Sequence, residues 1–72
     1  MTLEQFIEDR MAENGGDPIA MTVYDGDEIV ADYDMDGSTN AMDGHEWEDF
    51  QGKEVASVNI IADGGPYEVR LA

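Results

Sequence analysis

Residues 18–35, PIAMTVYDGDEIVADYDM, alternate apolar and polar side chains on both sides of Asp25-Gly26-Asp27. Alternation with a period of two is typical of a half-buried β-strand, and an Asp-Gly pair between two such runs indicates a hairpin turn. A two-residue loop would mix apolar and charged side chains on each face. A three-residue loop over 25–27 leaves one face wholly apolar, so we predict that register. Its pairs are Val23 with Ile29, Met21 with Ala31, and Ile19 with Tyr33.

The N-terminal segment TLEQFIEDRMAENGG has the pattern of a helix. Thr2 and Gln5 form a capping box, and Gly15-Gly16 supplies a stop. The apolar residues Leu3, Phe6, Ile7 and Met11 share one helical face, and the outer face carries Glu4, Glu8, Asp9 and Glu13.

The C-terminal segment EVASVNIIADGGPYEVRLA is predicted to form a second hairpin with a four-residue loop over 63–66. That loop pairs Ala62 with Tyr67, Ile60 with Val69, and Val58 with Leu71 on one apolar face. Between the two hairpins, Trp47 and Phe50 lie three positions apart and are expected to anchor a short helical turn to the core.

These elements predict one α+β domain over residues 1–72. Its N-terminal helix and short middle helical turn pack on one face of a four-stranded antiparallel sheet made of two hairpins. The other face of the sheet is expected to be polar.

Charge is the strongest functional signal, because 18 Asp and Glu against 3 Lys and Arg give a formal net charge of −15. The periodic apolar residues argue for a fold despite this self-repulsion. On the predicted strand, Glu28, Asp32, Asp34 and Asp36 share the solvent face. Side chains two apart on a strand stand roughly 6.7 Å from one another. Phosphates advance about 3.4 Å along each DNA strand, so such a row matches the scale of a nucleic-acid backbone.

The same aspartates also fit the opening of a calcium loop. With Asp32 at position 1 of an EF-hand type loop, the ligand positions are taken by Asp34, Asp36, Ser38, Asn40 and Asp43, with Gly37 at position 6. This spacing resembles the calcium loops of EF-hands and dockerins. However, position 12 holds Asp43 in place of glutamate, and the segment before the loop alternates like a strand where an EF-hand has a helix. A small calcium-binding module is therefore an alternative reading.

Other classes of function have less support in the sequence. The chain has no cysteine for a disulfide or thiolate site, and His45 is its single histidine. Ser38 lacks the strand-turn-helix context of a catalytic nucleophile, so we expect no enzymatic activity and no cofactor. No apolar run is long enough to span a membrane, and no signal pattern opens the chain, which predicts a soluble, cytoplasmic protein.

In size and acidity the chain resembles small phage-encoded anti-CRISPR proteins and anti-restriction DNA mimics. That resemblance implies an inhibitor, acting in the host bacterial cell, that binds a basic nucleic-acid-binding protein or CRISPR effector complex without contacting nucleic acid or membrane. The chain would act as a monomer or a small homo-oligomer. The expected contact residues are Glu28, Asp32, Asp34, Asp36, Asp43, Glu46, Glu48 and Asp49. Adaptation to a high-salt cytoplasm would give a similar composition without any partner.

Overall fold

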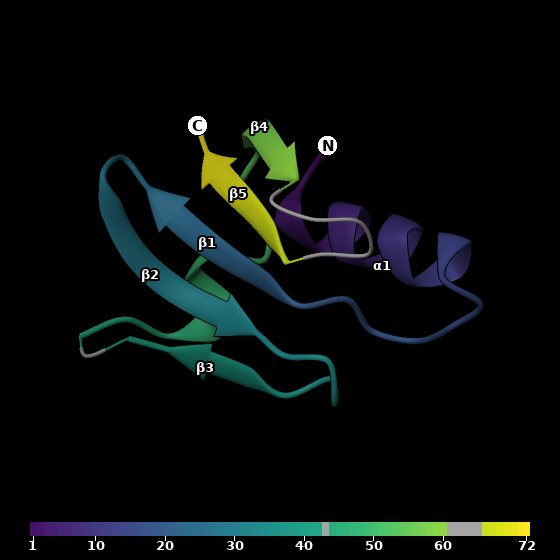
Figure 1. The fold of residues 1–72 in the computed structure, drawn as a ribbon. Helices are drawn as coiled ribbons and strands as arrows, with labels where there is room; N and C mark the ends of the chain where they lie inside the picture. Colours follow the sequence, from purple (N-terminus) through teal and green to yellow (C-terminus); the bar gives the residue numbers. More distant parts are fainter. Residues whose placement is uncertain (43, 61–65) are drawn as a thin grey trace.

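The computed structural model describes residues 1–42, 44–60 and 66–72. One helix, α1 (Leu3–Glu13), lies against one face of a five-stranded sheet (Figure 1). The strands are β1 (Met21–Asp25), β2 (Glu28–Tyr33), β3 (Thr39–Ala41), β4 (Val55–Ile60) and β5 (Tyr67–Leu71). A 3₁₀ turn, η1 (Trp47–Asp49), lies in the connection from β3 to β4. The α+β class predicted from the sequence is confirmed.

Helix α1 begins and ends where its sequence predicts. The Thr2 hydroxyl accepts from the Gln5 N–H at 3.2 Å, and the Gln5 side chain accepts from the Thr2 N–H at 2.9 Å, which completes the capping box. After the cap at Asn14, Gly15 and Gly16 both have positive φ. Leu3, Phe6 and Ile7 are buried, so the apolar face of the helix packs on the sheet.

The sheet has the order β3-β2-β1-β5-β4, so the prediction of four antiparallel strands is wrong. Strands β1 and β5 are neighbours and run parallel, which makes the sheet mixed. In this arrangement Met21 pairs with Tyr67 and Val23 with Val69, so the strands with the most regular apolar alternation occupy the centre. Alternation within each hairpin determines its faces, but it does not determine how one hairpin orients against the other.

The first hairpin has a two-residue turn, Gly26-Asp27, between the paired residues Asp25 and Glu28, where a three-residue loop was predicted. A β-bulge corrects the mismatch of faces that a two-residue turn creates. Val23 pairs with Ala31 and Tyr24 with Ile29, which leaves Val30 as the extra residue. Because the bulge shifts the alternation by one position, Val30 and Ala31 are both buried, whereas Ile29 is 44% exposed.

The register of the second hairpin differs by two residues from the predicted register. Ile60 pairs with Tyr67 and Val58 with Val69, and the expected loop residues 63–65 and Ala62 lie outside the described part of the chain. A shift of two positions keeps every side chain on its predicted face. Strand β4 is an outer strand, and its apolar side chains Val58 and Ile60 remain 39% and 57% exposed.

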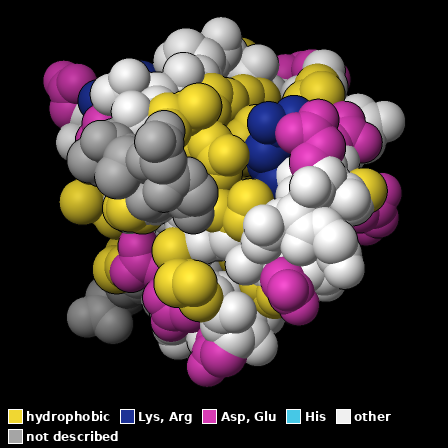
Figure 2. All heavy atoms as spheres, turned by 45° about the vertical axis from the view of Figure 1, so that its right-hand side comes forward, with side chains coloured by type: hydrophobic (Ala, Val, Ile, Leu, Met, Phe, Trp, Pro, Cys, Tyr) yellow, Lys and Arg dark blue, Asp and Glu magenta, His cyan; other side chains and the backbone are white. Residues whose placement is uncertain are grey.

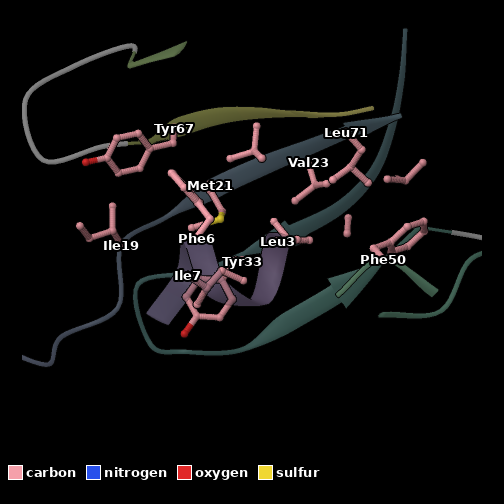
Figure 3. Packing of buried hydrophobic residues seen from close by; sticks show 13 residues of the cluster. Leu3, Phe6, Ile7, Ile19, Met21, Val23, Tyr33, Phe50, Tyr67 and Leu71 are labelled. Atoms are coloured by element: carbon pink, nitrogen blue, oxygen red, sulfur yellow. The ribbon is translucent and has the colours of Figure 1, made fainter. Parts of the chain in front are cut away.

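The core lies between α1 and the facing side of the sheet, where side chains from the helix and strands interdigitate (Figure 3). Phe50 is 2% exposed and Trp47 packs against the same cluster, so the connection through η1 is anchored as the sequence indicates. Two backbone hydrogen bonds tie the start of α1 to the residues after η1: Leu3 N–H to Lys53 C=O at 2.9 Å, and Glu4 N–H to Gln51 C=O at 3.0 Å. In the described ranges no helix is long and apolar enough to cross a membrane.

The turn of the first hairpin gives a direct test of its backbone geometry. Gly26 has φ +66°, and a Cβ placed there would meet no atom within 4 Å. Substituting Gly26→Ala is therefore expected to cost about 1–2 kcal/mol of unfolding free energy through backbone strain alone. Gly52 has equally open space and no positive φ, so Gly52→Ala serves as the matched control and is expected to stabilise the fold by about 0.4–1 kcal/mol. Urea denaturation of both variants measures the difference, and equal stabilities would contradict the turn geometry.

Candidate functional site

All eight acidic residues predicted to contact a partner fall within residues 28–49, a segment that contains no Lys or Arg. This segment forms β2, β3 and η1, which lie at one edge of the sheet. We refer to residues 28–49 as the acidic edge. At the opposite edge, β4 contains no charged residue. Within the sheet, the described carboxylates of residues 28–49 therefore lie toward the β3 edge, and β4 carries none.

The acidic edge does not present its aspartates as a single row along a strand. Strand β2 ends at Tyr33, so Asp34 and Asp36 lie beyond it in the turn that leads to β3. Asp32 remains on the strand, on the face opposite the core, with Thr22 and Asn40 as its cross-strand neighbours. The predicted row is therefore wrong in its geometry. The β2–β3 hairpin carries one carboxylate on its open face and two at its tip.

The turn at the tip holds its two carboxylates in place with hydrogen bonds. The Ser38 N–H donates to Asp36 Oδ1 at 2.9 Å, and the Asn40 side chain donates to Asp34 Oδ2 at 3.3 Å. The Ser38 hydroxyl lies 3.3 Å from Asp34 Oδ2. The side-chain and backbone hydrogen bonds of Ser38 hold the pKa of Asp36 below its usual value, because they stabilise the charged form. The hydrogen bonds thus fix the positions of both carboxylates at the tip and favour the charged form of Asp36.

Glu28 lies on the opposite side of the sheet from Asp32, which corrects the prediction that they share a face. Its carboxylate contacts His45 Nε2 at 2.9 Å, and the His45 ring packs 5.5 Å from that of buried Phe50. The bulge at Val30 is the physical cause, because the extra residue reverses the alternation between positions 28 and 32. Glu28 therefore lies on the core side of the sheet and contacts the segment between β3 and β4 that contains η1.

The remaining predicted contact residues are carried by that connection. Glu46, Glu48 and Asp49 are all exposed, and η1 is held on the core side by Trp47, whose ring stacks 6.3 Å from that of Tyr33. Asp43 lies outside the described residues. The acidic edge thus displays carboxylates on both faces of the β2–β3 hairpin and at its tip.

The structure brings together only some of the residues that the calcium-loop spacing predicts as ligands. Asp34, Ser38 and Asn40 do come together, but they do so through hydrogen bonds with one another within a β-hairpin. The flanking segments are strands, where an EF-hand has helices. Across residues 1–42, 44–60 and 66–72, no three His, Cys, Asp or Glu side chains are grouped so that they could hold a metal ion.

The open face of the sheet contains a polar network that the sequence analysis missed. Glu68 accepts from the Asn59 side chain at 3.1 Å and from the Tyr24 hydroxyl at 3.0 Å. Arg70 lies over the Tyr24 ring, 4.5 Å from its centroid, so the chain's own arginine stacks on this tyrosine. These donors lower the pKa of Glu68, and the hydrogen bond to Glu68 raises the pKa of Tyr24.

The network predicts a measurable pKa change. Substituting Asn59→Ala removes the largest cause of the shift and is expected to raise the pKa of Glu68 toward its ordinary value. A carboxyl with a lowered pKa stabilises the fold above its ordinary pKa, and this stabilisation is lost as the pH falls through the lowered pKa. An NMR titration of the Glu68 carboxyl carbon checks this, with Ser57→Ala as the control from the same face of β4. An unchanged titration in Asn59→Ala would contradict the network.

A second feature missed from the sequence is a pocket of about 210 Å³ between α1 and the acidic edge. The apolar side chains lining it are Ile7, Tyr33 and Trp47, and its polar lining residues are Glu4, Glu8, Thr39 and Gln51. Four separate segments contribute these residues, so no local pattern could have identified the pocket. The i, i+4 spacing of Glu4 and Glu8 was the only sign of the pocket in the sequence, and the same spacing is equally typical of a solvent-exposed helix face.

Few of the carboxylates in the described part of the chain are paired with a cation. The ion pairs found among the described residues join Asp25 with Lys53, Glu13 with Arg10, and Glu54 with the N-terminal amine. Figure 2 shows acidic side chains at several places around one face of the molecule, with apolar side chains toward its middle. Most of the negative charge is therefore available to a cationic partner.

No protein-family model, curated protein or solved structure matches the chain. Its function is therefore inferred from the arrangement and chemistry of its own side chains.

Proposed function

We propose that the protein is a non-enzymatic inhibitor whose acidic edge occupies the basic nucleic-acid-binding groove of another protein. The observation that carries this proposal is the composition of residues 28–49, whose seven described carboxylates lie at one edge of a folded sheet in a segment without Lys or Arg. A groove lined with Lys and Arg attracts such an edge for the same electrostatic reason that it attracts phosphates.

The placement of the carboxylates favours insertion into a groove over contact with a flat surface. Asp32 lies on the open face, Glu28 on the core side, and Asp36 at the tip of the β2–β3 hairpin. An edge that is charged on both faces and at its end can meet basic side chains on both walls of a groove at once. The hydrogen bonds that order the tip also reduce the entropy lost on binding.

The partner class that we propose is a phage-defence effector, in particular a CRISPR complex, which binds nucleic acid along a positively charged channel. Inhibitors of this kind are small and acidic, as this chain is. The high negative charge disfavours direct binding to DNA or RNA, so the inhibitor would act on the protein and exclude the nucleic acid. For a phage-encoded inhibitor, the site of action is the cytoplasm of the host cell.

Displacement of DNA tests the proposal. A fluorescently labelled duplex is bound to purified CRISPR effector complexes, one of each major type, and its anisotropy is followed as the protein is added at about 0.15 M salt. We expect stoichiometric release of the duplex from at least one effector, weakening steeply as salt rises. Retention of the duplex by every effector would contradict the proposal. It would favour the alternative that the acidity is an adaptation to high salt and serves no partner.

A further inference from the structure

The pocket between α1 and the acidic edge has a size and lining that select its occupant. At about 210 Å³ it is smaller than the roughly 300–1,000 Å³ typical of cofactor and small-molecule sites. It does have room for a single large side chain. The flat aromatic groups of Trp47 and Tyr33 form part of its wall, with their ring centroids 6.3 Å apart and their planes 30° from parallel.

The charge of the lining points to a cation. Glu4 and Glu8 are exposed, stand one helical turn apart on α1 and line the same pocket, and none of its lining residues is basic. The Tyr33 hydroxyl donates to Met11 Sδ at 3.4 Å, so that donor is directed to the helix. A group that enters this pocket therefore meets an aromatic wall and two carboxylates.

The surroundings of the pocket hold its shape. Helix α1 is fastened to the segment after η1 by the hydrogen bonds from Leu3 to Lys53 and from Glu4 to Gln51. Ile7 and Tyr33 are 9% and 8% exposed and belong to the core. Because two lining residues are core residues and a third is backbone-bonded, the pocket is preformed and binding would cost little ordering.

We propose that this pocket binds an arginine side chain of the basic partner, with the guanidinium stacked on Trp47 and hydrogen-bonded to Glu4 and Glu8. A planar guanidinium stacks on indole and donates to carboxylates in a fixed fork, which a lysine ammonium cannot do. This inference rests on the proposed function, because a nucleic-acid-binding groove is the source of the arginine. It adds two carboxylates of α1, which lie outside residues 28–49, to the surface that contacts the partner.

Titration with Nα-acetyl-arginine amide tests the pocket without any partner protein. The readouts are the fluorescence of Trp47, the single tryptophan, and the backbone amide NMR shifts of Thr39 and Gln51. We expect saturable changes at concentrations on the order of millimolar. The neutral isostere, Nα-acetyl-citrulline amide, is expected to bind about threefold more weakly or worse, because it lacks the charge.

Two double variants provide the control. Glu4→Gln with Glu8→Gln is expected to abolish the preference for arginine over citrulline, whereas Asp9→Asn with Asp17→Asn removes the same charge elsewhere and is expected to preserve it. Equal binding of citrulline, or shifts that spread over every acidic residue without saturating, would overturn the assignment. Such a result would overturn the pocket assignment alone. The proposed function would still be tested separately by DNA displacement, because this titration contains no effector.

Discussion

Replacing Asp32, Asp34 and Asp36 together by asparagine is expected to weaken displacement of DNA from the effector about tenfold or more. These residues place charge on the open face and at the tip of the β2–β3 hairpin, where the groove would surround them. Asparagine can still accept the hydrogen bonds from Ser38 and Asn40, so the turn is kept. The fold should be unchanged or slightly more stable, because repulsion among the carboxylates is reduced.

The control for this triple variant is a second triple variant with the same chemistry. Asp9, Asp17 and Asp27 are exposed, lie outside the acidic edge and take part in none of the ion pairs of the described chain. Replacing them by asparagine removes an equal amount of charge and is expected to leave displacement nearly intact. Equal losses in the two variants would mean that net charge alone governs binding, and full activity of the first would refute the placement of the site.

A second large effect is expected from Leu3→Ala. Leu3 is fully buried at the start of α1 and belongs to the main hydrophobic cluster. Truncation of a buried leucine costs about 2–5 kcal/mol, and a chain of this length has a total stability of only about 4–11 kcal/mol. The variant should therefore be largely unfolded by mild heating, with a melting temperature lowered by about 10 °C or more.

Ile29→Ala is the matched control for Leu3→Ala, because Ile29 is apolar but 44% exposed beside the bulge. Its effect is expected to remain below about 1 kcal/mol. Thermal and urea unfolding followed by circular dichroism compares the two variants. A Leu3→Ala protein as stable as the Ile29→Ala protein would contradict the packing of α1 on the sheet.

The features that sequence analysis predicted are those that local chemistry determines. Thr2 and Gln5 fix the start of α1, and the period-two alternation of Met21 and Val23 assigns the core face of β1. A two-residue error in register leaves faces unchanged, which is why the apolar face of β5 was predicted correctly from the wrong pairing.

The features that were missed depend on interactions between distant segments. The parallel pairing of β1 with β5 joins residues more than 40 positions apart, and no turn residue encodes it. Strand β3 consists of Thr39, Asn40 and Ala41, of which only Thr39 favours strands, and it is held by pairing with β2.

For the candidate site, the sequence identified a group of acidic residues but not their positions in space. The bulge at Val30 puts Glu28 and Asp32 on opposite faces, and its one sign in the sequence is the run of three apolar residues over 29–31, which interrupts the alternation. The hydrogen bonds of Ser38 and Asn40 belong to a turn that begins at Asp34. One interpretation of the sequence predicted a continued strand there, and the other predicted a calcium-binding loop. The pocket beside Trp47 required the assembled fold.

The central claim is that the acidic edge is the surface that contacts the partner. Hydrogen–deuterium exchange of the protein, free and bound to the effector from which it displaces DNA, tests this most directly. We predict slower exchange of amides within residues 28–49 on binding, with the amides of the uncharged strand β4 unchanged. Slower exchange confined to β4 and β5, with residues 28–49 unaffected, would contradict the claim.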